Sequence, residues 1–307
     1  MNPLRGIAFK LGAVLLFVVM SSLVKAASAY VPPGQTVFFR ALFAIPVILG
    51  WLVARGDLAT GLRTANPLGH LWRGLIGTTA MGLGFAGLGM LPLSEVQAIH
   101  YAAPLLVVIF AAFFLGERVR LVRLSAVALG MTGVLIVLWP RLTTLGNGEM
   151  ESRQALGAIL VLMSAIFAAF AQVFVRKLVR TESTSAVVFW FSVSAATLSL
   201  VTVPFGWVLP PAQALGLMVL SGLLGGVGQI FLTTAYRHAD ASVIAPFDYA
   251  SMIFAIAIGY FVFDEAPTGT MLLGALLVMS GGVLVIWRER KLGLKRGKAR
   301  PGMTPQG

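Results

Sequence analysis

Residues 93–115 read LSEVQAIHYAAPLLVVIFAAFFL, and this stretch indicates the fold class. From Ala102 to Leu115 it contains no charged residue. A membrane-spanning helix needs roughly 20 mostly apolar residues, whereas a strand of a membrane β-barrel shows a weaker alternation over about ten. Because the apolar run is continuous, we predict a helix that crosses a bilayer.

The composition of the whole chain agrees with this prediction. Hydrophobic residues make up 58% of the 307 residues and charged residues only 11%, where a soluble domain carries about a quarter charged residues. The mean hydropathy is +0.91. We therefore predict an all-α integral membrane protein with ten transmembrane helices, near residues 6–25, 34–54, 69–90, 93–115, 120–139, 154–177, 184–206, 212–236, 241–263 and 267–287.

The distribution of charge predicts an orientation. A net charge of +12 could indicate a nucleic-acid partner, but most of the 23 Lys and Arg residues, Arg73 among them, fall on the side that holds both termini. The other side takes only Lys25, Arg141 and Arg153, and Arg40 falls inside a span. This is the positive-inside pattern. We expect an inner-membrane protein with both termini cytoplasmic and no nucleic-acid partner.

The two halves of the chain resemble each other. The similarity is weak at each position, but the matches are collinear, and they predict a five-helix repeat at 6–139, an outer connecting loop at 140–153, a second five-helix repeat at 154–287 and a basic cytoplasmic tail at 288–307. Five is an odd number, so the second repeat should be inverted in the membrane, as in many secondary transporters. The tail could anchor the topology or contact anionic headgroups. Matched pairs include Lys25 with Arg176, Gly74 with Gly222, Tyr101 with Tyr249, and Glu117 with Glu265.

Several motifs are similar to those of a known family. The stretch from Leu93-Ser94 to Pro104, followed by FFLGE at 113–117 and by FVFDE at 261–265, resembles the drug/metabolite transporter superfamily, specifically its EamA-type ten-helix permeases. The resemblance covers about residues 6 to 288. It implies ten helices, cytoplasmic termini and a central cavity. It also implies transport of amino acids or other metabolites, in either direction, without a substrate signature.

Two predicted helices carry polar residues, which are costly inside lipid and need a reason. Gln97, His100 and Tyr101 share one face of the helix at 93–115, and Asp248 and Tyr249 occupy the matching face of the helix at 241–263. The paired tyrosines could stack on a flat ligand and donate hydrogen bonds, or each could be a structural residue bonded to a backbone carbonyl.

The titratable members of this set are candidates for proton coupling. Asp248 could bind a substrate ammonium or carry a proton, or it could be an internal partner for Arg40 or Lys10. His100 could relay protons or contact the ligand, or it could only donate a hydrogen bond between helices.

Other polar residues have less specific interpretations. Ser21, Gln172 and Gln229 are expected in the cavity wall, which completes the predicted substrate site. Arg40 could bind a carboxylate, although an ion pair or a headgroup contact is the first interpretation. Lys10 and Lys25 lie near helix ends and are expected to reach the interfaces. Glu95 is expected in water.

The same residues exclude some classes of protein. The absence of cysteine excludes disulfides and thiol catalysis, and neither a Gly-x-Ser-x-Gly elbow nor a His-Glu-x-x-His motif is present. We expect no enzyme activity, no metal and no cofactor. The expected partners are a small-molecule substrate and membrane lipids, with protons as a candidate coupling ion and a second copy as a candidate dimer partner.

The sequence thus favours a secondary carrier that works by alternating access. Export of amino acids or related metabolites is the first interpretation. Uptake of a nucleoside-like or sulfonium metabolite is the alternative, together with a lipid-headgroup flippase of the same fold.

Overall fold

The computed structural model describes residues 3–115, 121–144, 146, 148–178, 181–239 and 241–298, and this part of the chain contains helices and turns but no β-strand. Every predicted span is helical. The long elements of the first half are α1 (Pro3–Ala27), α2 (Pro33–Ala54), α4 (Pro67–Leu88), α5 (Leu93–His100), α6 (Ala102–Leu115) and α7 (Leu121–Thr143). Those of the second half are α8 (Glu149–Leu178), α9 (Thr184–Ser199), α10 (Ala212–His238), α12 (Ala250–Phe263) and α13 (Gly269–Lys298). The short elements are α3 (Leu58–Gly61), η1 (Leu200–Phe205), α11 (Ala241–Ile244) and η2 (Ala245–Tyr249).

Eight helical stretches of the described residues are long and apolar enough to cross a membrane. The other two predicted spans are helices that fall short of that measure. In α4, Arg73, His70 and a high glycine content lower the hydropathy, and in α13 the described apolar stretch, Gly269–Leu284, is too short. Large apolar side chains such as Phe113 and Phe261 are exposed on the outside of the bundle, as expected where lipid replaces water as the solvent.

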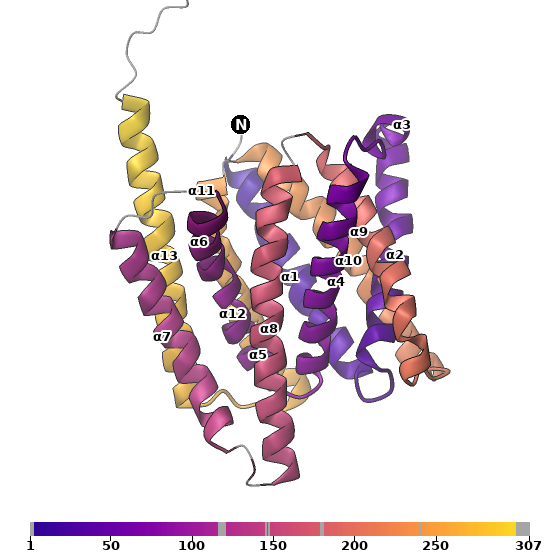
Figure 1. Cartoon of the computed structure of the whole chain (residues 1–307), viewed down its shortest axis with the longest axis vertical. Helices are drawn as coiled ribbons and strands as arrows, with labels where there is room; N and C mark the ends of the chain where they lie inside the picture. The colour runs from indigo at the N-terminus through magenta and orange to yellow at the C-terminus, as the bar shows by residue number, and fades with distance from the viewer. Residues whose placement is uncertain are drawn as a thin grey trace, which may run out of the picture.

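The helices stand roughly side by side (Figure 1). The beginning of α1 and the end of α13 lie at the same end of the bundle, and the turn between α7 and α8 lies at the other end. Helix α1 packs along α10, α4 packs along α8, and α7 packs along α13. These pairs bring the two halves of the chain into contact along their whole length.

Glycine makes the closest of these contacts possible. A Cβ added to Gly133 of α7 would lie 2.5 Å from the carbonyl oxygen of Gly274, and one added to Gly274 of α13 would lie 2.7 Å from that of Gly133. The two backbones therefore touch with no side chain between them, which is how small residues hold membrane helices together. Gly87 of α4 packs in a similar way, since a Cβ there would lie 2.8 Å from the carbonyl oxygen of Gly157 of α8.

Two predicted spans are interrupted. The helix expected over 93–115 breaks at Tyr101, and the helix expected over 241–263 is divided into α11, η2 and α12. Proline explains both breaks, because it has no N–H and cannot donate to the carbonyl four residues earlier. Pro104 deprives the carbonyl of His100 in this way, and Pro246 lies at the start of η2. The breaks place Tyr101 and Tyr249 at helix ends.

The connecting loop is shorter than expected. The sequence predicted a loop over 140–153, but α7 runs to Thr143 and α8 begins at Glu149. Acidic residues in the first turn of α8, Glu149 and Glu151, favour a helix start there. The helix α13 likewise continues into the basic tail as far as Lys298. Residues 299–307, the rest of that tail, lie outside the described residues.

Candidate functional site

The bundle encloses a central cavity with two adjoining lobes. The first lobe has a volume of about 450 Å³ and is lined by α1, α5, α6, α8, η2, α12 and α13. The second has a volume of about 400 Å³. It is lined by α1, α5 and α8 together with α2, α4, α9 and α10. The lobes share four lining residues, Ser21, Gln97, His100 and Gln172. All four were predicted from the sequence as site residues.

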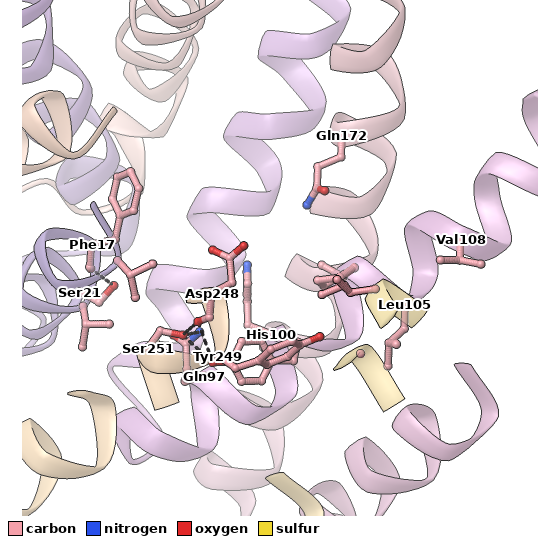
Figure 2. Close-up of a pocket in the computed structure, with 17 residues that line it drawn as sticks. Phe17, Ser21, Gln97, His100, Leu105, Val108, Gln172, Asp248, Tyr249 and Ser251 are labelled. Atoms are coloured by element: carbon pink, nitrogen blue, oxygen red, sulfur yellow. Dashed lines mark hydrogen bonds between the residues drawn. The ribbon is translucent and has the colours of Figure 1, made fainter. Parts of the chain in front are cut away.

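The matched tyrosines lie against each other in the first lobe. The ring centroids of Tyr101 and Tyr249 are 5.1 Å apart with an interplanar angle of 59°. The Tyr101 hydroxyl donates to the backbone oxygen of Asp248 at 3.3 Å and lies 2.5 Å from the hydroxyl of Ser251. Tyr101 is buried, and its bond to a backbone oxygen matches the alternative interpretation of a structural tyrosine. Tyr249 is half-buried and presents its ring to the lobe (Figure 2).

Ser251 is the centre of a small hydrogen-bond network that the sequence did not predict. Its hydroxyl accepts from the side-chain amide of Gln97 at 3.0 Å and donates to the backbone oxygen of Asp248 at 2.6 Å. The network joins α5 to the break at η2. Ser251 lies three residues after Asp248, on the same helical face, and this spacing could have identified it from the sequence.

Asp248 has an ion-pair partner. Its Oδ1 lies 2.6 Å from Nζ of Lys10, whose side chain is 3% exposed, while the Asp248 side chain is 50% exposed. The expectation that Lys10 reaches the interface was wrong, because α1 packs so closely on α10 and η2 that the ammonium is enclosed. Asp248, His100 of α5 and Gln172 of α8 all line the first lobe (Figure 2).

The remaining predicted residues also line the cavity. Ser21 of α1 donates its hydroxyl proton to the backbone oxygen of Phe17 at 3.0 Å. Gln229 lines the second lobe only, on the side of α10. His100 ends α5 and faces both lobes. The site residues predicted from the sequence are therefore gathered around one cavity.

Two arginines line the second lobe. Arg40 is 7% exposed and its Nε is buried with no hydrogen-bond partner among the described residues. Nε and Nη1 of Arg73 are also buried without a hydrogen-bond partner among the described residues. The guanidinium of Arg73 lies 3.6 Å from the ring centroid of Phe191. The sequence assigned Arg73 to the membrane surface, and it assigned Arg40 first to an ion pair or a headgroup. Neither assignment holds, because both helices turn these residues toward the cavity.

Further ion pairs close the end of the bundle opposite the termini. Nζ of Lys25 lies 2.8 Å from Oε1 of Glu265, and it also donates to the backbone oxygen of Leu91 at 2.5 Å. Glu265 accepts in turn from the backbone N–H of Leu93 at 2.8 Å. These bonds join α1, α4 and α5 to the segment between α12 and α13. Lys25 therefore does not reach out to the interface as expected, since its ammonium is held by the helix ends.

Glu95 was also misassigned. It was expected in water, but it is buried and receives two hydrogen bonds from Arg141, at 2.6 Å and 2.9 Å. Arg141 bonds Gln154 of α8 as well. The paired fork geometry is the strongest that arginine and a carboxylate can form.

Comparison with known proteins identifies the family. The model of the EamA-like transporter family matches residues 4–139 and again residues 155–287. The chain belongs to the EamA-like transporter family. A model of solute carrier family 35 also matches residues 91–206.

Individual EamA-like relatives are similar over most of their length. The chain is 30% identical to a pseudopaline exporter of Pseudomonas aeruginosa, over 92% of this chain and 93% of that protein. It is 30% identical to a riboflavin transporter of Rhizobium johnstonii, over 85% and 83%. It is 27% identical to an S-adenosylmethionine uptake transporter of Rickettsia bellii, over 94% and 97%. A solved crystal structure with 23% identity superposes with a TM-score of 0.65, covers 94% of this chain and 98% of its own, and supports the fold alone.

The family membership confirms the resemblance seen in the sequence. With its apolar helices, it makes the chain a multi-pass membrane protein of the transporter class. The named relatives are transporters of small molecules rather than enzymes.

Proposed function

We propose that this EamA-like chain is a secondary carrier that exports amino acids or related small metabolites across the inner membrane by alternating access. The observation that carries the proposal is the two-lobed cavity, in which Gln97, His100, Tyr249 and Asp248 gather inside a bundle of mostly apolar helices. Ligand sites are mostly apolar cavities with a few placed polar groups. The similarity to a pseudopaline exporter supports the outward direction.

The proposal includes two inverted five-helix repeats, over 6–139 and 154–287, which would exchange conformations. The family model matches the chain twice, over nearly these ranges. Matched helices also make matched contacts: α1 packs along α10, and α8 packs along α4. A Cβ on Gly74 would meet Ser194, and a Cβ on the matching Gly222 would meet Phe43, which itself matches Ser194.

We assign the end of the bundle that carries Lys25 and Glu265 to the outer side. The positive-inside pattern favours cytoplasmic termini, and the beginning of α1 and the end of α13 lie together at the opposite end (Figure 1). The ion pair would then close the outer side of the cavity, and it would have to break when the cavity opens outward.

Proton coupling would act through Asp248 and His100. Asp248 is half-exposed to the first lobe while it holds Lys10. A proton or a substrate ammonium that binds this carboxylate competes with Lys10, and this competition links occupancy of the site to the position of α1. His100 adjoins both lobes, so it would pass protons between Asp248 and the second lobe.

The alternative is uptake of a nucleoside-like or sulfonium metabolite. The similarity to several S-adenosylmethionine uptake transporters favours it, and the paired tyrosines offer a stacking surface for a flat ring.

Counterflow in liposomes tests the proposal. The purified protein is reconstituted with a high internal concentration of one unlabelled compound, and entry of its labelled form is followed without ATP. The panel contains amino acids, nucleosides and S-adenosylmethionine. We expect saturable counterflow of amino acids, and we expect Tyr249→Ala to weaken it about fivefold, since an aromatic contact contributes about 1 kcal/mol.

The control is Tyr260→Ala, which removes an exposed tyrosine of α12 outside the cavity. It should leave counterflow unchanged. Counterflow of S-adenosylmethionine alone would support the alternative, and counterflow of no compound by a folded protein would contradict a carrier of either class.

A further inference from the structure

We propose that the second lobe is a subsite for an oxyanion group, a carboxylate or a phosphate, of the transported molecule, and that Arg40 and Arg73 bind it. The inference rests on the proposed function, because it names the chemical class of the substrate of that same cavity. It is carried by the two arginines and by the absence of any acidic residue among the described residues that line this lobe.

The first step is the burial of the two guanidinium groups. Nε of Arg40, and Nε and Nη1 of Arg73, are buried and have no hydrogen-bond partner among the described residues. A buried charge without compensation costs several kcal/mol, and a charge inside a membrane protein usually faces a partner or a functional cavity. These N–H groups are therefore donors with no internal acceptor.

The second step is that the nearby carboxylates are already committed. Asp248 holds Lys10, Glu265 holds Lys25, and Glu95 holds Arg141. No carboxylate of the described residues lies within ion-pair distance of Arg40 or Arg73. Both guanidinium groups line this one lobe. An anion bound there would compensate the burial of both charges.

The third step is the close packing of helix backbone around the two arginines. A Cβ on Gly225 of α10 would lie 3.3 Å from Nε of Arg40, and a Cβ on Gly77 of α4 would lie 3.2 Å from Nη1 of Arg73. These glycines occupy matching positions of the two repeats. They let each guanidinium approach a helix backbone closely, while the ring of Phe191 contacts Arg73 from α9. Arginine is suited to this task, because its planar fork matches a carboxylate or a phosphate.

The two lobes together indicate a bipolar substrate. The first lobe offers Tyr249 and the carboxylate of Asp248, and the second offers only positive charge. Gln97 and His100 lie between them. A molecule with an oxyanion at one end and an amine or a ring at the other would complement both lobes at once, and a free amino acid is the smallest of this kind.

The experiment compares acids with their neutral amides on the full-length protein in nanodiscs of phosphatidylcholine. The probes are phenylalanine with phenylalaninamide, benzoate with benzamide, and inorganic phosphate. Binding is measured by the shift of the melting temperature, because a ligand of the folded state raises it by mass action. We expect at least one acid or phosphate to stabilise the protein, while its matched amide does not.

Variants then assign the effect to the arginines. Arg40→Gln and Arg73→Gln should each weaken the response to the acid by about tenfold or more. Arg40→Lys keeps the charge but loses the fork, and it should fall in between. The matched control is Arg55→Gln, since Arg55 is exposed at the end of α2 and pairs with Asp57 outside the cavity. If a Gln variant does not fold, the comparison of acids with amides on the unmodified protein still tests whether it binds an oxyanion.

Two results would overturn the inference. One is an equal shift of the melting temperature with acids and with their amides, or no shift with any anion. The other is a stabilisation that appears only with phosphatidylglycerol in the nanodisc, which would make the anion a lipid headgroup. Counterflow of a neutral or cationic substrate that survives in Arg40→Gln at unchanged affinity would also exclude the subsite, but it would leave the carrier function in place.

Discussion

Lys10 Nζ lies 2.6 Å from Oδ1 of Asp248, and this ion pair joins α1 to the break in the second-half helix at the wall of the cavity. The lysine is enclosed and the carboxylate is half-exposed, so only Asp248 is open to a ligand. The pair therefore serves two purposes. It neutralises a charge that α1 carries into the bundle, and it leaves a carboxylate surface for a proton or an ammonium.

Asp248→Asn should abolish substrate- or proton-dependent counterflow. It also removes the carboxylate that pairs with the buried Lys10, and loss of one member of a buried ion pair destabilises the fold. The double variant Lys10→Met with Asp248→Asn removes both charges and should recover the melting temperature without recovering counterflow. Recovery of both would make the pair purely structural. Asp264→Asn is the matched control, because Asp264 is exposed and its left-handed backbone (φ 56°) suits asparagine.

Gly282→Ala should displace Tyr249. The Tyr249 hydroxyl lies directly on Gly282 of α13, where a Cβ would collide with the ring. The ring is rigid and must swing away as a unit, so we expect counterflow affinity to fall about as far as in Tyr249→Ala. Gly50→Ala is the control, since a Cβ there meets nothing within 4 Å. An unchanged affinity in Gly282→Ala would remove Tyr249 from the site.

Glu265→Gln should bias the cavity toward the outward-open state. It removes the charge partner of Lys25 at the end that we assign to the outer side. Because the chain has no cysteine, a single cysteine at Val14 in the first lobe reports access without background. We expect faster labelling from the outer side by an impermeant maleimide. Equal rates with and without Glu265→Gln would show that the pair is not a gate.

Glu182→Gln should lower stability above acidic pH. Burial by itself would raise the pKa of Glu182, but hydrogen bonds from Ala65 N–H, the Thr64 hydroxyl and Asn66 N–H hold it below its usual value. A depressed pKa contributes stability that is present above the unfolded pKa of about 4.3 and is lost as the pH falls through the folded one.

The melting temperature of the two proteins should therefore differ at pH 7 and converge below about pH 4. Each lost bond to the charged carboxylate contributes on the order of 1 kcal/mol. A difference that persists unchanged into the acidic range would contradict this account of Glu182.

Helices and candidate site residues followed from the sequence because their signals are local. Most predicted spans are long, mainly apolar runs, and their described residues are helical, although the span over 241–263 is divided into α11, η2 and α12. Gln97, His100 and Asp248 could be selected because polar residues are rare in such runs. The breaks at Tyr101 and Tyr249 were missed, although Pro104 and Pro246 are present in the sequence. Hydropathy alone does not show where helical backbone hydrogen bonds are absent.

The sequence offered Lys10 only as one candidate partner of Asp248, and it predicted no partner for Lys25 or Glu95. Lys10 and Lys25 resembled interfacial lysines, since both lie near helix ends, and Glu95 resembled a wet carboxylate. Their partners Asp248, Glu265 and Arg141 lie far away in the chain. Arg73 was assigned to the surface for the same reason.

The sequence by itself determined that this is a helical membrane protein of the EamA-like family with related halves, because hydropathy and repetition are properties of the chain alone. The tertiary structure decided which charges neutralise one another, and it turned Arg40 and Arg73 toward a cavity with no carboxylate partner among the described residues. The physical reason is that a charge in a low-dielectric bundle is controlled by the few groups within about 4 Å of it, and only the packing of helices from both halves decides which groups those are.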